Sequence, residues 1–69
     1  MSRYTYWGVI WRGKRDLHKR TQRINLDEAQ ARRLFARQCT AGYAVALVGV
    51  QVLPSLNTLP TIVEHSPNW

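Results

Sequence analysis

The sequence has little of the chemistry that metal sites and disulfide scaffolds need. It contains one cysteine, Cys39, and two histidines, His18 and His65. A single cysteine cannot form an internal disulfide, which favours a reducing compartment. A metal site needs several thiolate or imidazole ligands that converge, and these three residues stand at unrelated spacings. We therefore expect no metal site.

Acidic residues are also few, with four Asp and Glu against ten Lys and Arg and a net charge of +6. Asp27 and Glu28 begin a helical pattern, where acids stabilise the positive end of the helix dipole. Asp16 and Glu64 stand alone, so no carboxylate pair is available for acid–base catalysis. Cys39 flanks an apolar helical stripe, as a small core residue does, and the scattered glycines form no phosphate-binding loop. We expect no enzymatic activity, no cofactor and no small-molecule substrate.

Long hydrophobic runs are missing. The longest, residues 41–53, covers thirteen residues, whereas a membrane-spanning helix needs about twenty. The first eight residues, MSRYTYWG, lack the charged segment, apolar run and cleavage site of a secretory signal. These absences predict a cytoplasmic protein with no membrane association.

The residues that are present predict a small α+β domain. Residues 4–12 are aromatic and β-branched, which is typical of a strand, and Gly13 and Lys14 suit a two-residue hairpin turn. Residues 16–23 would return as a second, polar edge strand. Residues 43–53 alternate as a third strand whose even-numbered face, from Ala46 to Val52, is apolar and is expected to meet the helix.

A helix is expected between these strands, because the segment has start and stop signals. Asn25 is a predicted N-cap, Glu28 three residues later completes a capping box, and Gly42 supplies a left-handed stop. The apolar stripe is flanked by Leu26 and Cys39 and consists of Ala31, Leu34, Phe35 and Gln38.

Together the elements predict a β-β-α-β fold, with a three-stranded antiparallel sheet of order 2-1-3 and the helix on one face. Residues 1–53 form this domain. Residues 54–69, punctuated by Pro54, Pro60 and Pro67, form an extended C-terminal tail that packs on the domain or on a partner, with at most a short strand at 61–64. One helix leaves the second sheet face without cover, unless the C-terminal tail with Ile62, Val63 and Trp69 folds over it or a second subunit packs there.

An aromatic sheet face is the first candidate functional site. A chain of 69 residues buries only about 60% of the surface that its unfolded form exposes, so its stability is marginal and oligomerisation is expected. Aromatic side chains dominate the energetics of protein interfaces. The leading interpretation is a non-enzymatic interaction module that binds itself or another protein through Tyr6, Trp7, Trp11 and Trp69.

The basic hairpin provides an alternative. Residues 13–23 hold five of the ten Lys and Arg residues beside the aromatic strand. Cations neutralise phosphates, and exposed rings stack on unpaired bases. The alternative function is sequence-tolerant nucleic-acid binding, although no known nucleic-acid motif is matched. Its candidate residues are Lys14, Arg15, Lys19, Arg20 and Arg23. The same charges also suit an edge strand that must avoid pairing with other molecules.

Residues 21–53 carry a hairpin strand, the acid-capped helix LDEAQARRLFARQ and a Gly-Tyr turn into a Val-rich strand. This pattern resembles small accessory proteins of actinobacterial phages. The resemblance implies an intracellular phage accessory protein that acts in the host cell cytoplasm by binding a partner of unspecified kind, with inhibition of host growth as one outcome. It assigns no functional residue, and it covers neither the Trp-rich first strand nor the residues after 53.

Overall fold

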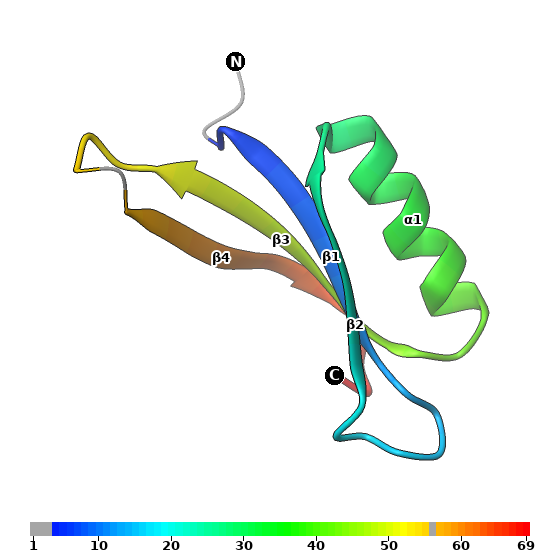
Figure 1. The fold of residues 1–69 in the computed structure, drawn as a ribbon. Helices are drawn as coiled ribbons and strands as arrows, with labels where there is room; N and C mark the ends of the chain where they lie inside the picture. The colour runs from blue at the N-terminus through cyan, green and yellow to red at the C-terminus, as the bar shows by residue number, and fades with distance from the viewer. Residues whose placement is uncertain (1–3, 56) are drawn as a thin grey trace.

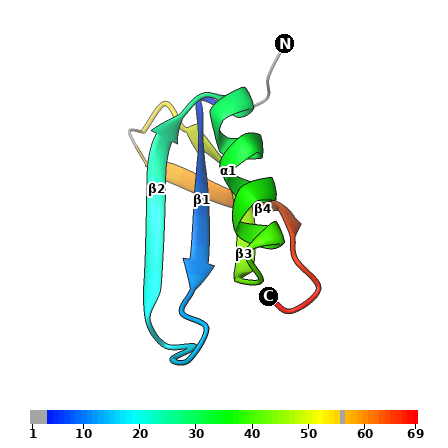
Figure 2. The ribbon, with the colours of Figure 1, turned by 90° about the vertical axis from the view of Figure 1, so that its right-hand side faces the viewer.

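The computed structural model describes residues 4–55 and 57–69. Its elements are β1 (Tyr6–Arg12), β2 (Arg20–Leu26), α1 (Glu28–Thr40), β3 (Ala44–Val52) and β4 (Thr58–His65). The strands form one antiparallel sheet in the order β2-β1-β3-β4, and α1 lies on one face of it, over β1 and β3 (Figures 1 and 2). The α+β class is confirmed. The predicted three-stranded sheet was wrong, because β4 pairs with the outer side of β3.

The fourth strand was mistaken for part of a tail because of its proline. Pro60 lies opposite Val50 in β4, the outermost strand, and an edge strand tolerates proline because its second side donates to no neighbour. Beyond β4, the backbone N–H of the buried Ser66 donates to the Val45 carbonyl at 2.9 Å, and its Oγ accepts from the Val45 N–H at 2.9 Å. Residues 58–66 are therefore tied into the sheet along most of β3.

The β1–β2 connection is longer than the predicted two-residue turn. It covers residues 13–19 and is closed by a 2.7 Å hydrogen bond from the Gly13 N–H to the Lys19 carbonyl. A Cβ on Gly13 would lie 2.7 Å from the Asp16 carbonyl oxygen, so only glycine lets the loop fold back this closely. β2 consequently starts at Arg20, and Ile10 pairs with Gln22.

The helix begins two residues later than predicted. Asp27 is the N-cap: its carboxylate accepts from the Gln30 N–H at 2.7 Å, and the Gln30 side chain closes the capping box. Asn25 instead adopts a φ of 61° where the β1–β2 register shifts, a conformation that asparagine tolerates better than most residues. Gly42 has a φ of 92°, which confirms the left-handed stop. Among the described residues, no helix is both long and apolar enough to cross a membrane.

Odd-numbered residues of β3 face α1, which corrects the prediction that its even face would meet the helix. Val45 and Leu47 join Trp7, Val9 and Ala31 in the core beneath α1. Both faces of β3 are apolar, so alternation within β3 could not show which face meets the helix. The register with β1 places Leu47 opposite Val9, and this puts the odd-numbered residues of β3 on the α1 side. The even-numbered residues form a second apolar cluster on the opposite face, composed of Ala46, Val48 and Val50 with Tyr6, Ile10 and Trp69.

The Trp7 ring is enclosed on several sides. Tyr4 meets it edge to face, with ring centroids 5.2 Å apart, and the Arg32 guanidinium lies 5.4 Å from its centroid. Arg32 is held there by Glu28 in α1 and Glu64 in β4, each at 2.9 Å. The Tyr4 ring itself rests on Gly49, where a Cβ would come within 2.5 Å of it. Gly49 thus provides the space that lets Tyr4 cover Trp7.

Replacing Gly49 by alanine is expected to lower the free energy of unfolding by about 1 to 3 kcal/mol, because the new methyl group displaces the Tyr4 ring. Urea unfolding followed by circular dichroism measures the change. The control is Tyr4→Leu with and without Gly49→Ala: without the ring, the alanine should be tolerated. An equal effect of the alanine in both backgrounds would contradict the assigned contact.

Candidate functional site

The sheet face opposite α1, which we call the open face, is the first candidate site. Strand register arranges its side chains in rows across the sheet. From the β1–β2 loop to the β3–β4 loop, these rows are Arg20–Arg12–Ala44, Gln22–Ile10–Ala46–His65, Ile24–Gly8–Val48–Ile62, Tyr6–Val50–Pro60 and Val52–Thr58. The Lys, Arg, Asp and Glu side chains in these rows are Arg12 and Arg20, and both stand in the first row.

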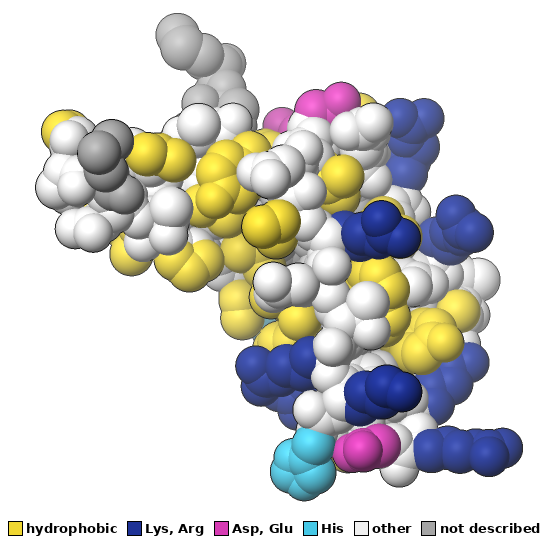
Figure 3. Space-filling view, viewed as in Figure 1, with side chains coloured by type: hydrophobic (Ala, Val, Ile, Leu, Met, Phe, Trp, Pro, Cys, Tyr) yellow, Lys and Arg dark blue, Asp and Glu magenta, His cyan; other side chains and the backbone are white. Residues whose placement is uncertain are grey.

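Three large apolar side chains on this face are exposed. Ile24 and Ile62 are each 49% exposed and Val52 is 40% exposed. Val48 and Val50 lie between them and are buried, within the cluster that Tyr6 and Ile10 flank. Figure 3 shows hydrophobic side chains gathered along the strands, whereas Lys and Arg gather toward the lower and right-hand parts of the view. The open face therefore carries three exposed apolar side chains and has a basic end.

The C-terminal residue lies at that basic end. The Arg12 guanidinium stacks 4.5 Å from the Trp69 ring centroid, and the Trp69 N–H donates to the Ser66 carbonyl at 3.1 Å. Trp69 packs against the Ala46 cluster, and the buried Arg12 Nε has no hydrogen-bond partner. Trp69 thus covers part of the open face and leaves the rows beyond it uncovered.

The four aromatic residues predicted to bind a partner are divided between the two faces. Tyr6 and Trp69 belong to the open face, and Trp7 and Trp11 to the side that carries α1. Trp7 is only 5% exposed, which leaves no ring surface for a partner. The sequence interpretation did not include Ile24 and Ile62 among the binding residues. The alternation of side chains within β2 and β4 assigns both residues to the open face, but only after these outer strands have been placed in the sheet.

Neither sheet edge is suited to pairing with another strand. β2 carries Arg20 and Arg23, and β4 carries Pro60, Glu64 and His65. Charges and proline on edge strands discourage edge-to-edge association. Strand pairing between the sheets of two copies is therefore disfavoured.

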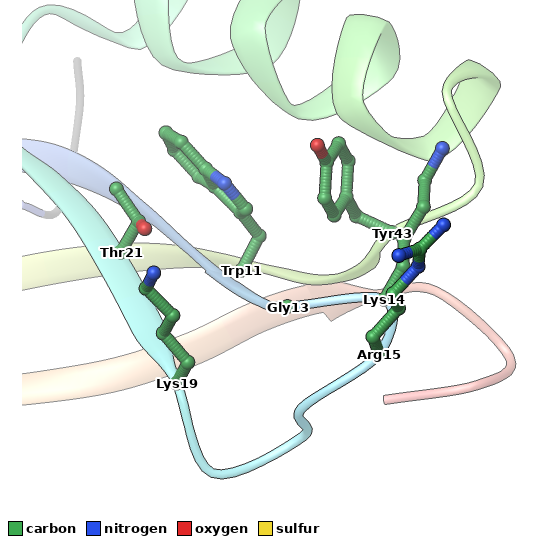
Figure 4. A pocket seen from close by; sticks show the side chains of 7 residues that line it. All are labelled: Trp11, Gly13, Lys14, Arg15, Lys19, Thr21 and Tyr43. Atoms are coloured by element: carbon green, nitrogen blue, oxygen red, sulfur yellow. The ribbon is translucent and has the colours of Figure 1, made fainter.

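The second candidate site is a cleft of about 380 Å³ on the α1 side of the hairpin. Figure 4 shows the side chains that line it, which are those of Trp11, Lys14, Arg15, Lys19, Thr21 and Tyr43, with Gly13 at its base. Of the five basic residues predicted to bind nucleic acid, three line this cleft. Arg23 shares the α1 side through its pairing with Val9, whereas Arg20 pairs with Arg12 on the open face.

Arg32 and Cys39 have pKa values that are shifted by their surroundings. Hydrogen bonds from Arg32 to Glu28 and Glu64 raise the pKa of Arg32. Burial, with a smaller contribution from Glu64, raises the pKa of the Cys39 thiol, which keeps it protonated and weakly nucleophilic at neutral pH. Across residues 4–55 and 57–69, no three His, Cys, Asp or Glu side chains come together as metal ligands would.

Comparison with protein-family models, curated proteins and solved structures finds no match to this chain. The resemblance to phage accessory proteins therefore stays a prediction, and so does inhibition of host growth. The case for function rests on the open face and the cleft.

Proposed function

We propose that this protein is a non-enzymatic interaction module that forms a homodimer through its open face. The observation that carries the proposal is the exposure of Ile24, Val52 and Ile62 on the same side of the sheet. Full burial of one such side chain contributes about 1.5 to 3 kcal/mol. A two-fold interface uses each of them twice.

The distribution of charge favours a second copy as the occupant. A two-fold axis running across the strands would set the first row of one copy on the last row of the other. Val52 would then meet Ala44 of the second copy, and the Arg12 and Arg20 side chains of the two copies would lie at opposite ends of the interface, so like charges would stay apart. The central row would meet itself, with Ile62 against the Ile62 of the second copy. The face is thus complementary to itself in this orientation.

The open face is of limited size. It spans five rows along the strands and at most four strands across. With a rise of about 3.4 Å per residue and about 4.8 Å between strands, its backbone measures roughly 27 by 14 Å. A standard interface buries about 800 Å² per partner, so the dimer uses the side chains of the whole face. Because both edges are unsuited to strand pairing, this face is the surface that we propose for contact between two copies.

Replacing Ile62 by aspartate is expected to abolish the dimer, because two carboxylates would be desolvated against each other at the central row. The dissociation constant should rise by at least about 100-fold, or roughly 2.7 kcal/mol. Sedimentation equilibrium over a range of protein concentrations measures it. Circular dichroism should show unchanged secondary structure, since the Ile62 side chain is half exposed in the single chain.

Leu59→Asp is the matched control. Leu59 is 50% exposed and lies in the same strand, but it pairs with Gln51 and faces the other side of the sheet. It should leave the dissociation constant within about two-fold of the wild-type value, a difference of roughly 0.4 kcal/mol. A monomeric wild-type protein, or equal effects of the two substitutions, would reject self-association through the open face. If the wild-type protein is a monomer, the open face would bind a different protein instead of a second copy.

A further inference from the structure

We infer that the cleft beside the hairpin binds single-stranded nucleic acid, holding one unpaired base against Trp11 and Tyr43 while the loop cations contact its phosphates. This site lies on the α1 side of the sheet, away from the proposed dimer interface, and the inference does not depend on the dimer. It rests on three features: the rings of Trp11 and Tyr43, the cations of the β1–β2 loop, and the arginines of α1.

The two rings are brought together by strand register. Trp11 pairs with Val45 on the α1 side of the sheet. Tyr43 precedes Val45 by two residues. Residues two apart share a face of a strand, so the two side chains are diagonal neighbours. Figure 4 shows both rings projecting from the sheet toward α1. Both are half-buried, which leaves ring surface accessible from the cleft.

The cations around the rings have no carboxylate to neutralise them. Lys14 Nζ lies 4.8 Å from the Tyr43 ring centroid, and Arg15 and Lys19 line the cleft beside it. Within residues 4–55 and 57–69, the ion pairs all involve Arg32. The nearby Asp16 carboxylate instead accepts a 3.0 Å hydrogen bond from the His18 N–H. These cations are therefore available for phosphates.

Further basic residues lie on α1. Arg32 marks the β4 side of the helix, since it pairs with Glu64. The 100° helical step places Gln30 and Arg37 on the opposite flank, toward β2, and a second hollow of about 290 Å³ lies there between Gln30, Arg33, Leu34 and Arg37. In Figure 2, β2 lies to the left of β1 and α1 to its right, so the flank of α1 that faces left in this view is the one directed toward β2. A strand whose base enters the cleft could extend its backbone along this flank.

The shape of the cleft favours an unpaired base. Its volume of about 380 Å³ falls within the ~300–1,000 Å³ typical of ligand pockets. The two half-buried rings stand in the cleft, where an unpaired base can stack on them, whereas a base inside a duplex has both of its faces covered by its neighbours. A free nucleotide offers the same base and phosphate, but it would leave Arg23, Arg33 and Arg37 without a ligand. These cations point to a polymer.

Binding is measured by fluorescence anisotropy with a labelled DNA strand of mixed sequence, about 12 nucleotides long, within the range that small single-strand-binding folds occupy. Trp11→Leu should weaken binding between about five-fold and 100-fold, the loss expected for one stacked base. Affinity should fall linearly with the logarithm of salt concentration, and Lys19→Gln should reduce that slope by about 0.7.

Arg20→Gln is the matched control, because Arg20 follows Lys19 directly but lies on the open face. It should leave both affinity and slope nearly unchanged. Equal effects of Lys19→Gln and Arg20→Gln would show general charge attraction and overturn the site. Equal binding of inorganic polyphosphate would exclude base recognition, and equal affinity for thymidine monophosphate would indicate a free nucleotide. Ile62→Asp should bind the strand as the wild-type protein does, which separates this test from that of the dimer.

Discussion

Replacing Trp7 by alanine is expected to lower the free energy of unfolding by about 3 to 5 kcal/mol. Trp7 is 5% exposed and fills the space between the sheet and α1. Its removal leaves a cavity, and Tyr4 and Arg32 lose the ring that they contact. A domain of this size rarely has more than about 3 to 5 kcal/mol of stability from a single core. The variant should therefore be largely unfolded in water, as seen by urea titration and circular dichroism.

Trp69→Ala provides the comparison for this substitution. Trp69 is half-buried at the end of the open face, where the Arg12 guanidinium lies over its ring. Its loss should lower the free energy of unfolding by less than half as much, because the residue closes no cavity under the helix. If the two alanine variants unfolded at the same urea concentration, the core would not be centred where the structure places it.

Removing residues 54–69 is expected to prevent folding altogether. The shortened chain loses β4, the two hydrogen bonds between Val45 and Ser66, and the Arg32–Glu64 ion pair. It also turns β3, whose residues 44–50 are buried on both faces, into an unprotected apolar edge, which is a strong aggregation hazard. Circular dichroism and size-exclusion chromatography should show an unfolded or aggregated chain.

This deletion distinguishes two descriptions of the C-terminal segment. If residues 54–69 were a tail packed on a complete domain, residues 1–53 would fold cooperatively with a modest loss of stability. A full-length variant with Ser66→Ala serves as the milder control. It removes only the side-chain acceptor of the buried Val45 N–H, and an unmet buried donor destabilises by about 1 to 3 kcal/mol.

Much of the fold could be predicted from local signals. The helix had an acidic first turn, an apolar stripe and Gly42 at its end, and all three are found in the structure. The N-cap was misplaced because Asn25 and Asp27 both suit that role by type, and the choice depends on a register shift between β1 and β2. Pro60 hid the fourth strand, because the sequence does not reveal that this strand is outermost.

The candidate sites depended on facts that no local pattern contains. In β1, aromatic residues occupy both faces, so the positions of Trp7 and Tyr6 relative to α1 were undetermined until β3 and β4 were placed. Tyr43 was missed as a cleft residue for a related reason. It meets Trp11 only through pairing of strands more than thirty residues apart. The composition did indicate aromatic rings beside cations, and the cleft has both.

The most direct test of the open face as a dimer interface is an isotope-filtered NOE measurement on a mixture of labelled and unlabelled protein. The two-fold arrangement predicts intermolecular NOEs between the Val52 methyl groups and the Trp69 indole. Within one chain Trp69 stacks on Arg12, which pairs with Ala44, and packs on the cluster that includes Ala46, so Val52 lies about six to eight residues or roughly 20 to 25 Å away along β3. Intermolecular NOEs from α1 instead, or none at concentrations where the protein is dimeric, would contradict the account.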